Sequence, residues 1–209
     1  MYKTFLGLIT FVFIGSTAVA QKHEKPSDGT GFKVNWVSVG GEYGQSLNKL
    51  TNREATSLSA SFLIGLNNGV VLEARNRTQQ ADNTSITATP NYGAPLSWQE
   101  LGLSRQYNVK ITNLYARGLV GMHETTNKRY SWHAHEFGVT DRISGTPFGY
   151  IIGYRWQDSF KDGNNANNEQ SRYTLYYNIN KSHRISIRRT FQTGDTPTNM
   201  TNIGYSYRF

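Results

Sequence analysis

Seven arginines share a pattern that suits the binding of anions. Each stands in a segment where apolar and polar residues alternate, and each falls in the polar phase of its segment. They are Arg75, Arg77, Arg117, Arg155, Arg172, Arg188 and Arg208. A guanidinium group presents its N–H donors in a planar fork that matches a carboxylate or phosphate. If the polar phase faces a common interior, the sequence predicts an anion-binding surface there.

Three glutamates, Glu42, Glu73 and Glu100, fall in the same phase and compete for these guanidinium groups. Charges inside proteins are normally paired, so equal numbers would favour a network that only holds the structure together. Four arginines stay unmatched if each glutamate neutralises one. We therefore interpret the surplus as the lining of a pore that attracts anions. The alternative is a plugged barrel whose interior charges satisfy one another.

A second set of residues suggests catalysis or metal binding. His133 and His135 stand two residues apart, and His123 would lie diagonally across the preceding hairpin. Histidines in this spacing can bind a metal or transfer protons. Because the spacing fixes no third ligand and no nucleophile, we predict that they fill a polar interior. We expect no metal site, no cofactor and no catalytic residue, and keep a hydrolase using His133 and His135 as a minor alternative.

Ten alternating segments would have to position these side chains. Alternation at period two is typical of β-strands that separate two different media. The segments are 32–43, 57–66, 70–77, 100–109, 114–123, 130–139, 149–157, 172–179, 185–192 and 200–209. A phase change near Trp36, and another between Ala134 and Phe137, predict two β-bulges. An error in this count would give eight or twelve strands.

The connections between the segments also alternate in character. The odd-numbered ones are mostly polar and include the long stretch Thr78–Pro95, whereas the even-numbered ones are mostly short, as in Asn67-Asn68-Gly69. Outer-membrane barrels have short periplasmic turns and longer external loops. We therefore predict an all-β, transmembrane, antiparallel up-and-down β-barrel. A soluble β-sandwich also has short alternating strands, but gives no reason for so many Tyr and Trp residues near strand ends.

Two arginines break the alternation, because Arg105 and Arg189 fall in the outward, apolar phase. An arginine that faces lipid costs about 2–4 kcal/mol at the bilayer midplane and almost nothing at the interface. Either each lies near a rim and extends its charge into water, or a local bulge reverses the phase.

The last ten residues, Met200–Phe209, form the closing strand in this prediction. Ile203, Tyr205, Tyr207 and Phe209 share one face, and aromatic rings in such a row suit a lipid interface. This ending resembles the C-terminal signal of Gram-negative outer-membrane barrels, whose last strand pairs with the first. The resemblance implies that Tyr205, Tyr207 and Phe209 form an assembly signal for the barrel-assembly machinery.

The beginning of the chain has the three parts of a secretory signal peptide. Lys3 precedes the apolar run 5–14, and Ala18-Val19-Ala20 precedes Gln21. The run is too short to cross ~30 Å of hydrocarbon. We predict a signal peptide over residues 1–20, a single barrel domain over 21–209, and export to the bacterial outer membrane. The absence of cysteine fits, since a closed barrel has no open edge that disulfides would need to secure.

Composition alone leaves the partner open. The formal net charge is +8, and it is +7 without Lys3 of the predicted signal peptide. Such a balance suits nucleic acid, acidic lipid or an acidic solute, and the inward phase of the arginines favours the solute. We expect a monomer in contact with outer-membrane lipid and lipopolysaccharide that accepts small anionic solutes and no nucleic acid.

The whole pattern is similar to one family of small monomeric porins, the oligogalacturonate-specific porins. The shared features are the signal peptide, the inward arginine rows, the Tyr-rich outward face, the Asn-rich loops and the ending 203–209. The resemblance implies passive uptake of negatively charged sugars, with the seven arginines as lining residues. A function of another class is a structural or adhesive barrel that conducts nothing and acts through its external loops, especially 78–95.

Overall fold

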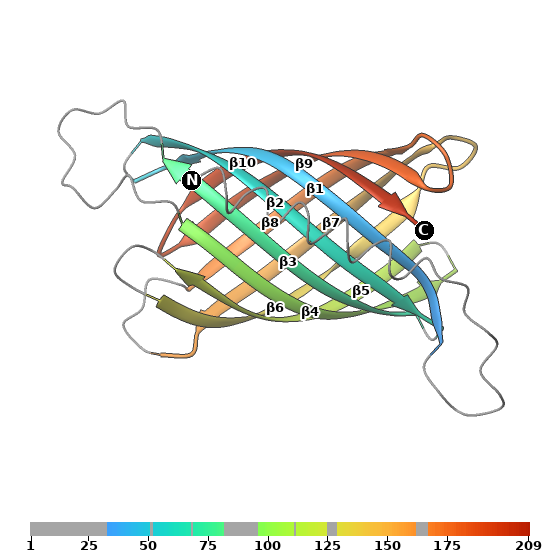
Figure 1. Ribbon diagram of the computed structural model, residues 1–209, viewed down its shortest axis with the longest axis horizontal. Coiled ribbons are helices and arrows are strands. Elements are labelled where there is room, and N and C mark those ends of the chain that lie inside the picture. The colour runs from blue at the N-terminus through green and yellow to red at the C-terminus, as the bar shows by residue number, and fades with distance from the viewer. Residues whose placement is uncertain are drawn as a thin grey trace.

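The computed structural model describes residues 33–50, 52–67, 69–81, 96–110, 112–124, 129–161 and 167–209. The strands are β1 (Val34–Asn48), β2 (Arg53–Leu66), β3 (Val70–Ala81), β4 (Leu96–Val109), β5 (Thr112–Glu124), β6 (Arg129–Arg142), β7 (Phe148–Ser159), β8 (Asn168–Asn178), β9 (His183–Gly194) and β10 (Thr198–Arg208). Each strand pairs antiparallel with its neighbours in sequence, and β10 pairs with β1, so the sheet closes into a barrel (Figure 1). The ten-stranded up-and-down prediction is confirmed.

The two ends of the barrel differ in their connections. The connections 67–69, 110–111, 143–147 and 179–182 lie at one end, together with the start of β1 and the end of β10 (Figure 1). We name this the short-turn end. At the opposite end, the strand ends are separated by the two longest stretches of sequence, 82–95 and 160–167. The predicted loop Thr78–Pro95 begins later than expected, because β3 continues through Ala81; its remainder and the predicted signal peptide lie outside the described residues.

The strands are staggered around the barrel. Paired residues followed once around the wall from Trp36 lead to Asn48, twelve residues further along β1. A closed sheet with such a stagger has strands tilted by about 35–45° to the axis. The tilt is visible in Figure 1, where the strands run obliquely across the long axis. It brings side chains from strands that do not pair to the same level of the interior.

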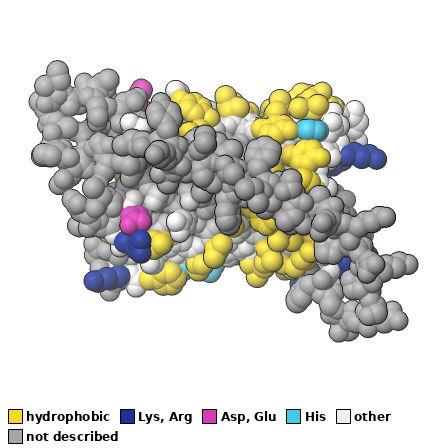
Figure 2. Space-filling model, viewed as in Figure 1, with side chains coloured by type: hydrophobic (Ala, Val, Ile, Leu, Met, Phe, Trp, Pro, Cys, Tyr) yellow, Lys and Arg dark blue, Asp and Glu magenta, His cyan; other side chains and the backbone are white. Residues whose placement is uncertain are grey.

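The barrel is apolar outside and polar inside. In β7, Ile152 and Trp156 are exposed on the outer wall, whereas the alternating residues Arg155 and Gln157 are buried in the interior. In Figure 2, hydrophobic side chains gather on the visible outer wall, and charged side chains lie toward the two ends. No helix within the described ranges is long and apolar enough to cross a membrane. The reversed polarity of the wall is what a barrel surrounded by lipid requires.

The closing strand pairs with β1 from Ser38 to Asn48. Beyond the last pair, the backbone N–H of Phe209 donates to the carbonyl of Val37 at 2.9 Å. The ring of Tyr207 lies 4.7 Å from that of Phe209 and 4.9 Å from that of His183 on the outer wall. The prediction that Met200–Phe209 closes the barrel is confirmed, and its role as an assembly signal stays a prediction.

One of the two predicted bulges is present. The register between β1 and β2 shifts between Val34 and Trp36, as predicted. The register of β6 with both neighbours is continuous, so the bulge predicted between Ala134 and Phe137 was wrong. Trp132 and Ala134 point inward and pack with Leu119, each of the two being 1% exposed. The error arose because an apolar residue packed inside the barrel has the same sequence signal as one that faces lipid.

Large inward rings lie flat against the wall over glycines of the neighbouring strand. Trp36 is paired with Gly65, and Trp132 with Gly121. A Cβ atom at either glycine would overlap the ring of the paired tryptophan. Glycine is therefore required at these two positions, because it lets the ring lie along the wall instead of crossing the interior.

Candidate functional site

The structure places all seven predicted arginines on the inward face, and it adds two residues that the sequence analysis missed. Glu136 was missed because the false bulge in β6 obscured its phase, yet its side chain is 4% exposed. Arg184 was missed because it precedes the first apolar residue of its segment, although it shares the phase of Ser186 and Arg188. The described interior thus holds eight arginines against four glutamates, and a ninth arginine in the inward phase, Arg142, is exposed at the rim where β6 ends.

Two glutamates organise a chain of charges through the middle of the interior. Glu73 binds Arg75 at 2.8 Å and Arg117 at 3.4 Å. Glu136 binds Arg172 at 2.6 Å and approaches Arg117 at 3.8 Å. The chain therefore runs from β3 through β5 and β6 to β8. Of these strands, β5 and β6 pair with each other, whereas β3 and β5, and β6 and β8, do not. The Glu136 carboxylate also accepts a hydrogen bond from a neutral group, the Tyr115 hydroxyl, at 2.9 Å.

Two further ion pairs complete this layer. Arg155 of β7 binds Glu100 of β4 at 2.9 Å, and Arg188 of β9 binds Glu42 of β1. The first pair joins strands that are three apart in barrel order, so it crosses part of the interior. All four inward carboxylates are therefore engaged by arginine. We name these four glutamates and their five arginines, Arg75, Arg117, Arg155, Arg172 and Arg188, the central charge layer.

Three inward arginines have no carboxylate partner among the described residues. Arg77 donates to the side-chain oxygen of Gln79 at 3.2 Å, and Arg184 donates to that of Asn178 at 2.9 Å. Each of the three instead lies over an aromatic ring, an arrangement that stabilises a cation without neutralising it. The pairs are Arg77 over Trp98 at 4.9 Å, Arg184 over Tyr176 at 4.0 Å and Arg208 over Trp36 at 4.4 Å.

The interior also keeps unused hydrogen-bond donors. The Nε atoms of six arginines are buried and have no hydrogen-bond partner among the described protein atoms. They belong to Arg75, Arg77, Arg117, Arg155, Arg172 and Arg188. A buried donor without a partner costs free energy, so it favours the entry of water or of a solute with acceptor oxygens.

The wall formed by β10, β1 and β2 is lined mainly by small residues. The inward positions at the level of the central charge layer include Gly40, Gly44, Ser59, Ser61 and Gly204. Glu42 is the one inward charge of this wall at that level. The interior is therefore asymmetric, with long arginine side chains on one side and little side-chain volume on the other.

The histidines divide between the two faces of the wall. With the regular register of β6, His133 and His135 face outward, and their rings lie 5.8 Å apart. His123 faces inward, between Trp98 and Tyr130. The prediction that all of them fill the interior was therefore wrong for His133 and His135, because it depended on the false bulge. No group of three acidic, His or Cys side chains suited to a metal occurs in the described parts of the chain.

The two outward arginines follow the first of the alternatives raised by the sequence. Arg105 and Arg189 are exposed on the outer wall in regular strands, so no bulge reverses their phase. Arg105 lies 5.2 Å over Tyr107, and Arg189 lies 5.2 Å over Phe191. Each ring is two residues nearer to an end of the barrel, so both side chains lean toward a rim.

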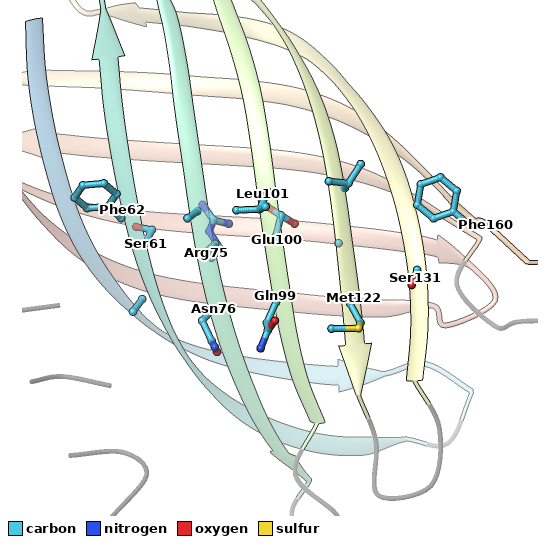
Figure 3. Close-up of a pocket in the computed structure, with 14 residues that line it drawn as sticks. Ser61, Phe62, Arg75, Asn76, Gln99, Glu100, Leu101, Met122, Ser131 and Phe160 are labelled. Atoms are coloured by element: carbon cyan, nitrogen blue, oxygen red, sulfur yellow. The ribbon is translucent and has the colours of Figure 1, made fainter. Parts of the chain in front are cut away.

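A groove of about 560 Å³ lies on the outer wall across β2 to β6. In Figure 3, Asn76, Gln99 and Met122 lie beside one another between Phe62 and Phe160. These five side chains point away from the interior, although Arg75 and Glu100 of the central charge layer also contribute to the lining of the groove. It is an outward surface and contributes nothing to a path through the barrel.

The chain has the fold of outer-membrane β-barrels, as a comparison with solved structures shows. An outer membrane channel from Pseudomonas putida F1 covers 90% of this chain and 100% of its own, with 9% identity and a TM-score of 0.54. The translocator domain of the autotransporter NalP from Neisseria meningitidis covers 100% and 98%, with 9% identity and a TM-score of 0.47. The KdgM porin in complex with disordered oligogalacturonate covers 82% and 99%, with 9% identity and a TM-score of 0.41. No family model and no curated protein matches the sequence. At these identities the likeness concerns the fold alone.

Proposed function

We propose that this protein is an outer-membrane channel through which small anionic solutes diffuse passively. The observation that carries the proposal is the surplus of eight inward arginines over four inward glutamates, together with the buried Nε donors that lack partners. A cation entering such an interior meets net positive charge. An anion meets guanidinium forks that replace part of its hydration shell.

The position of the charges supports diffusion along one side of the interior. The small inward residues of β10, β1 and β2 fill less of the interior than the arginines of β3, β5 and β8 do. A solute that carries carboxylates could exchange between successive guanidinium groups along this side without covalent chemistry. Acidic oligosaccharides are a suitable substrate class, because they combine repeated carboxylates with a narrow, flexible chain.

The same proposal includes the surroundings of the barrel. Lipid and lipopolysaccharide would cover the apolar outer wall, and the barrel-assembly machinery would recognise Tyr205, Tyr207 and Phe209. The closed sheet has no free strand edge that would require a second subunit, so we propose a monomer. No enzymatic activity is proposed, since His133 and His135 lie on the opposite face from the charged interior.

Ion selectivity in a planar bilayer tests the proposal. Under a salt gradient, the reversal potential should show preference for anions. The preference should weaken from 0.1 M to 1 M salt, because the Debye length falls from ~10 Å to ~3 Å. Replacing Arg77, Arg172 and Arg188 by Gln should shift the potential toward cations, whereas Arg129→Gln, outside the interior, should not. A cation-selective channel would contradict the proposal.

A non-conducting structural or adhesive barrel is the second candidate, and the Arg155–Glu100 pair favours it. This pair crosses part of the interior, and Arg155 is 3% exposed. If such contacts fill the interior at all levels, no solute can pass. Purified protein that is fully folded yet silent in bilayers and in liposome swelling would establish this alternative.

A further inference from the structure

Positive charge at the short-turn end of the interior is not neutralised. Arg184 is paired in register with Ser206, and Arg208 follows two residues later on the same inward face. The two arginines are therefore diagonal neighbours on adjacent strands, within reach of each other's side chains. Arg142, the last residue of β6, shares the inward phase. Its register partner Gly149 is paired in turn with Tyr176, the residue whose ring lies under Arg184.

Aromatic rings hold two of these guanidinium groups in place. Arg184 lies 4.0 Å over Tyr176, and its Nε donates to Asn178 at 2.9 Å, which leaves both terminal nitrogens of Arg184 without a described partner. The Tyr176 hydroxyl is fixed in turn, since it donates to the carbonyl of Asp141 at 3.1 Å. A guanidinium group that is already held in place loses less side-chain freedom when it binds an anion, so binding costs less free energy.

Arg208 is supported in the same way. Its guanidinium lies 4.4 Å over Trp36, and Trp36 lies flat over Gly65. A Cβ atom at Gly65 would displace the ring and with it the platform under Arg208. The rings that support Arg184 and Arg208 therefore come from different strands, β8 and β1. These two strands flank the pair β9–β10, which carries the arginines.

The described carboxylates near this end do not compensate the three charges. All four inward glutamates already bind arginines of the central charge layer. Asp141 falls in the outward phase and accepts hydrogen bonds from the Asn113 side chain at 3.4 Å and from the backbone of Arg142 at 2.9 Å. Three like charges held together repel, and a ligand with several negative charges relieves that repulsion.

We propose that Arg142, Arg184 and Arg208 form a binding site for a small multivalent oxyanion, a polycarboxylate or a phosphate, at the short-turn mouth of the barrel. The site deepens the proposed function, because it names where the anion is held and at which mouth. Binding does not require conduction, so the two can fail separately.

Trp36 provides a direct readout of this site. An anion that binds Arg208 changes the environment of the indole beneath it, so citrate or inorganic phosphate should alter Trp36 fluorescence in protein refolded in detergent. Trp36→Phe should abolish that component. Arg184→Gln and Arg208→Gln should each weaken the apparent affinity for citrate by roughly tenfold. Arg208→Lys, which keeps the charge but loses the planar fork, should give an intermediate value.

Matched controls separate the site from general charge effects. Arg129→Gln removes one positive charge at the opposite end and should leave citrate binding unchanged. Acetate at equal ionic strength should bind far more weakly than citrate. Each variant counts as folded if its unboiled sample migrates differently from its boiled sample on a gel, as the wild type should. Citrate affinity equal to wild type in a folded Arg184→Gln/Arg208→Gln variant, or a citrate signal that survives Trp36→Phe, would overturn the proposal.

Bilayer recordings then separate binding from conduction. If the channel conducts, citrate added on the side of the short-turn mouth should block current at lower concentration than citrate added on the other side. Equal block from both sides, with wild-type citrate affinity in the arginine variants, would count against the site but not against the channel. Citrate binding without any current would leave the site intact and reject the channel.

Discussion

Arg155 reaches from β7 to bind Glu100 of β4 at 2.9 Å, which joins two strands that share no hydrogen-bonded ladder. Its side chain is 4% exposed, and that of Glu100 is 10% exposed. The guanidinium also lies 4.9 Å over Trp132, which rests on Gly121. This pair thus spans the part of the interior between β4 and β7, and it stabilises the barrel through contacts other than strand pairing.

Glu100→Gln should destabilise the barrel, because it leaves the Arg155 charge buried without its carboxylate. We expect a loss of about 3 kcal/mol in the free energy of unfolding, measured by denaturant titration of protein refolded in micelles. The double variant Glu100→Gln/Arg155→Gln should recover part of this loss, since it removes the uncompensated charge. A double variant that is less stable than the single one would show that the pair stabilises mainly by packing.

Closure of the barrel should be visible as heat-modifiable mobility on a gel. A sheet in which β10 pairs with β1 has no free edge and resists detergent until it is boiled. Folded protein should therefore migrate differently from boiled protein. Identical migration, with recovery of the protein in the soluble periplasmic fraction, would refute the membrane-barrel interpretation.

Deletion of Phe209 should reduce assembly in cells far more than it reduces the stability of refolded protein. Its ring contributes contacts on the outer wall, and its backbone N–H adds one hydrogen bond beyond the β1–β10 pairs. Phe148→Ala is a matched control, because Phe148 is an outward aromatic at the same end but outside the closing strand. Equal losses of membrane-inserted protein for the two variants would argue against a role of Phe209 as a signal.

The cost of an outward arginine should depend on its height in the wall. Arg105 leans toward the rim over Tyr107, whereas Leu103 is one outward position further from the short-turn end. Leu103→Arg should destabilise the folded barrel in vesicles by up to about 2–4 kcal/mol. Arg105→Leu should change its stability little. Similar effects of both changes would mean that the hydrocarbon region does not begin between these positions.

Alternation in the sequence was enough to predict the strand number, the closing strand and the inward phase of most strands. In most of β8 the two phases differ in polarity, with Arg172 and Thr174 inward and Tyr173 and Leu175 outward, so the inward set could be predicted directly. In β6 they do not: Trp132 and Ala134 are apolar yet inward, and this led to the false bulge and to the wrong placement of His133 and His135.

The pairing of charges could not be predicted at all. Glu73 and Arg117 lie on strands that do not pair, and only the tilt of the barrel brings them to 3.4 Å. Likewise, no sequence signal links Trp36 to Arg208, although Arg208 lies over its ring. The sequence therefore predicted which residues face inward, while the curvature and stagger of the wall determine which of them meet.

The stagger of twelve residues also limits how the gene can change in length. Loss of one residue within a strand would turn every later side chain of that strand to the other face, and exchange apolar for charged residues on the wall. Loss of two residues would preserve the faces but slide one strand past its neighbour, so that Arg155 would no longer lie opposite Glu136. Insertions and deletions should therefore be tolerated in the connections at the end opposite the short-turn end. Inside the strands they should be selected against, even when they leave every side chain on its original face.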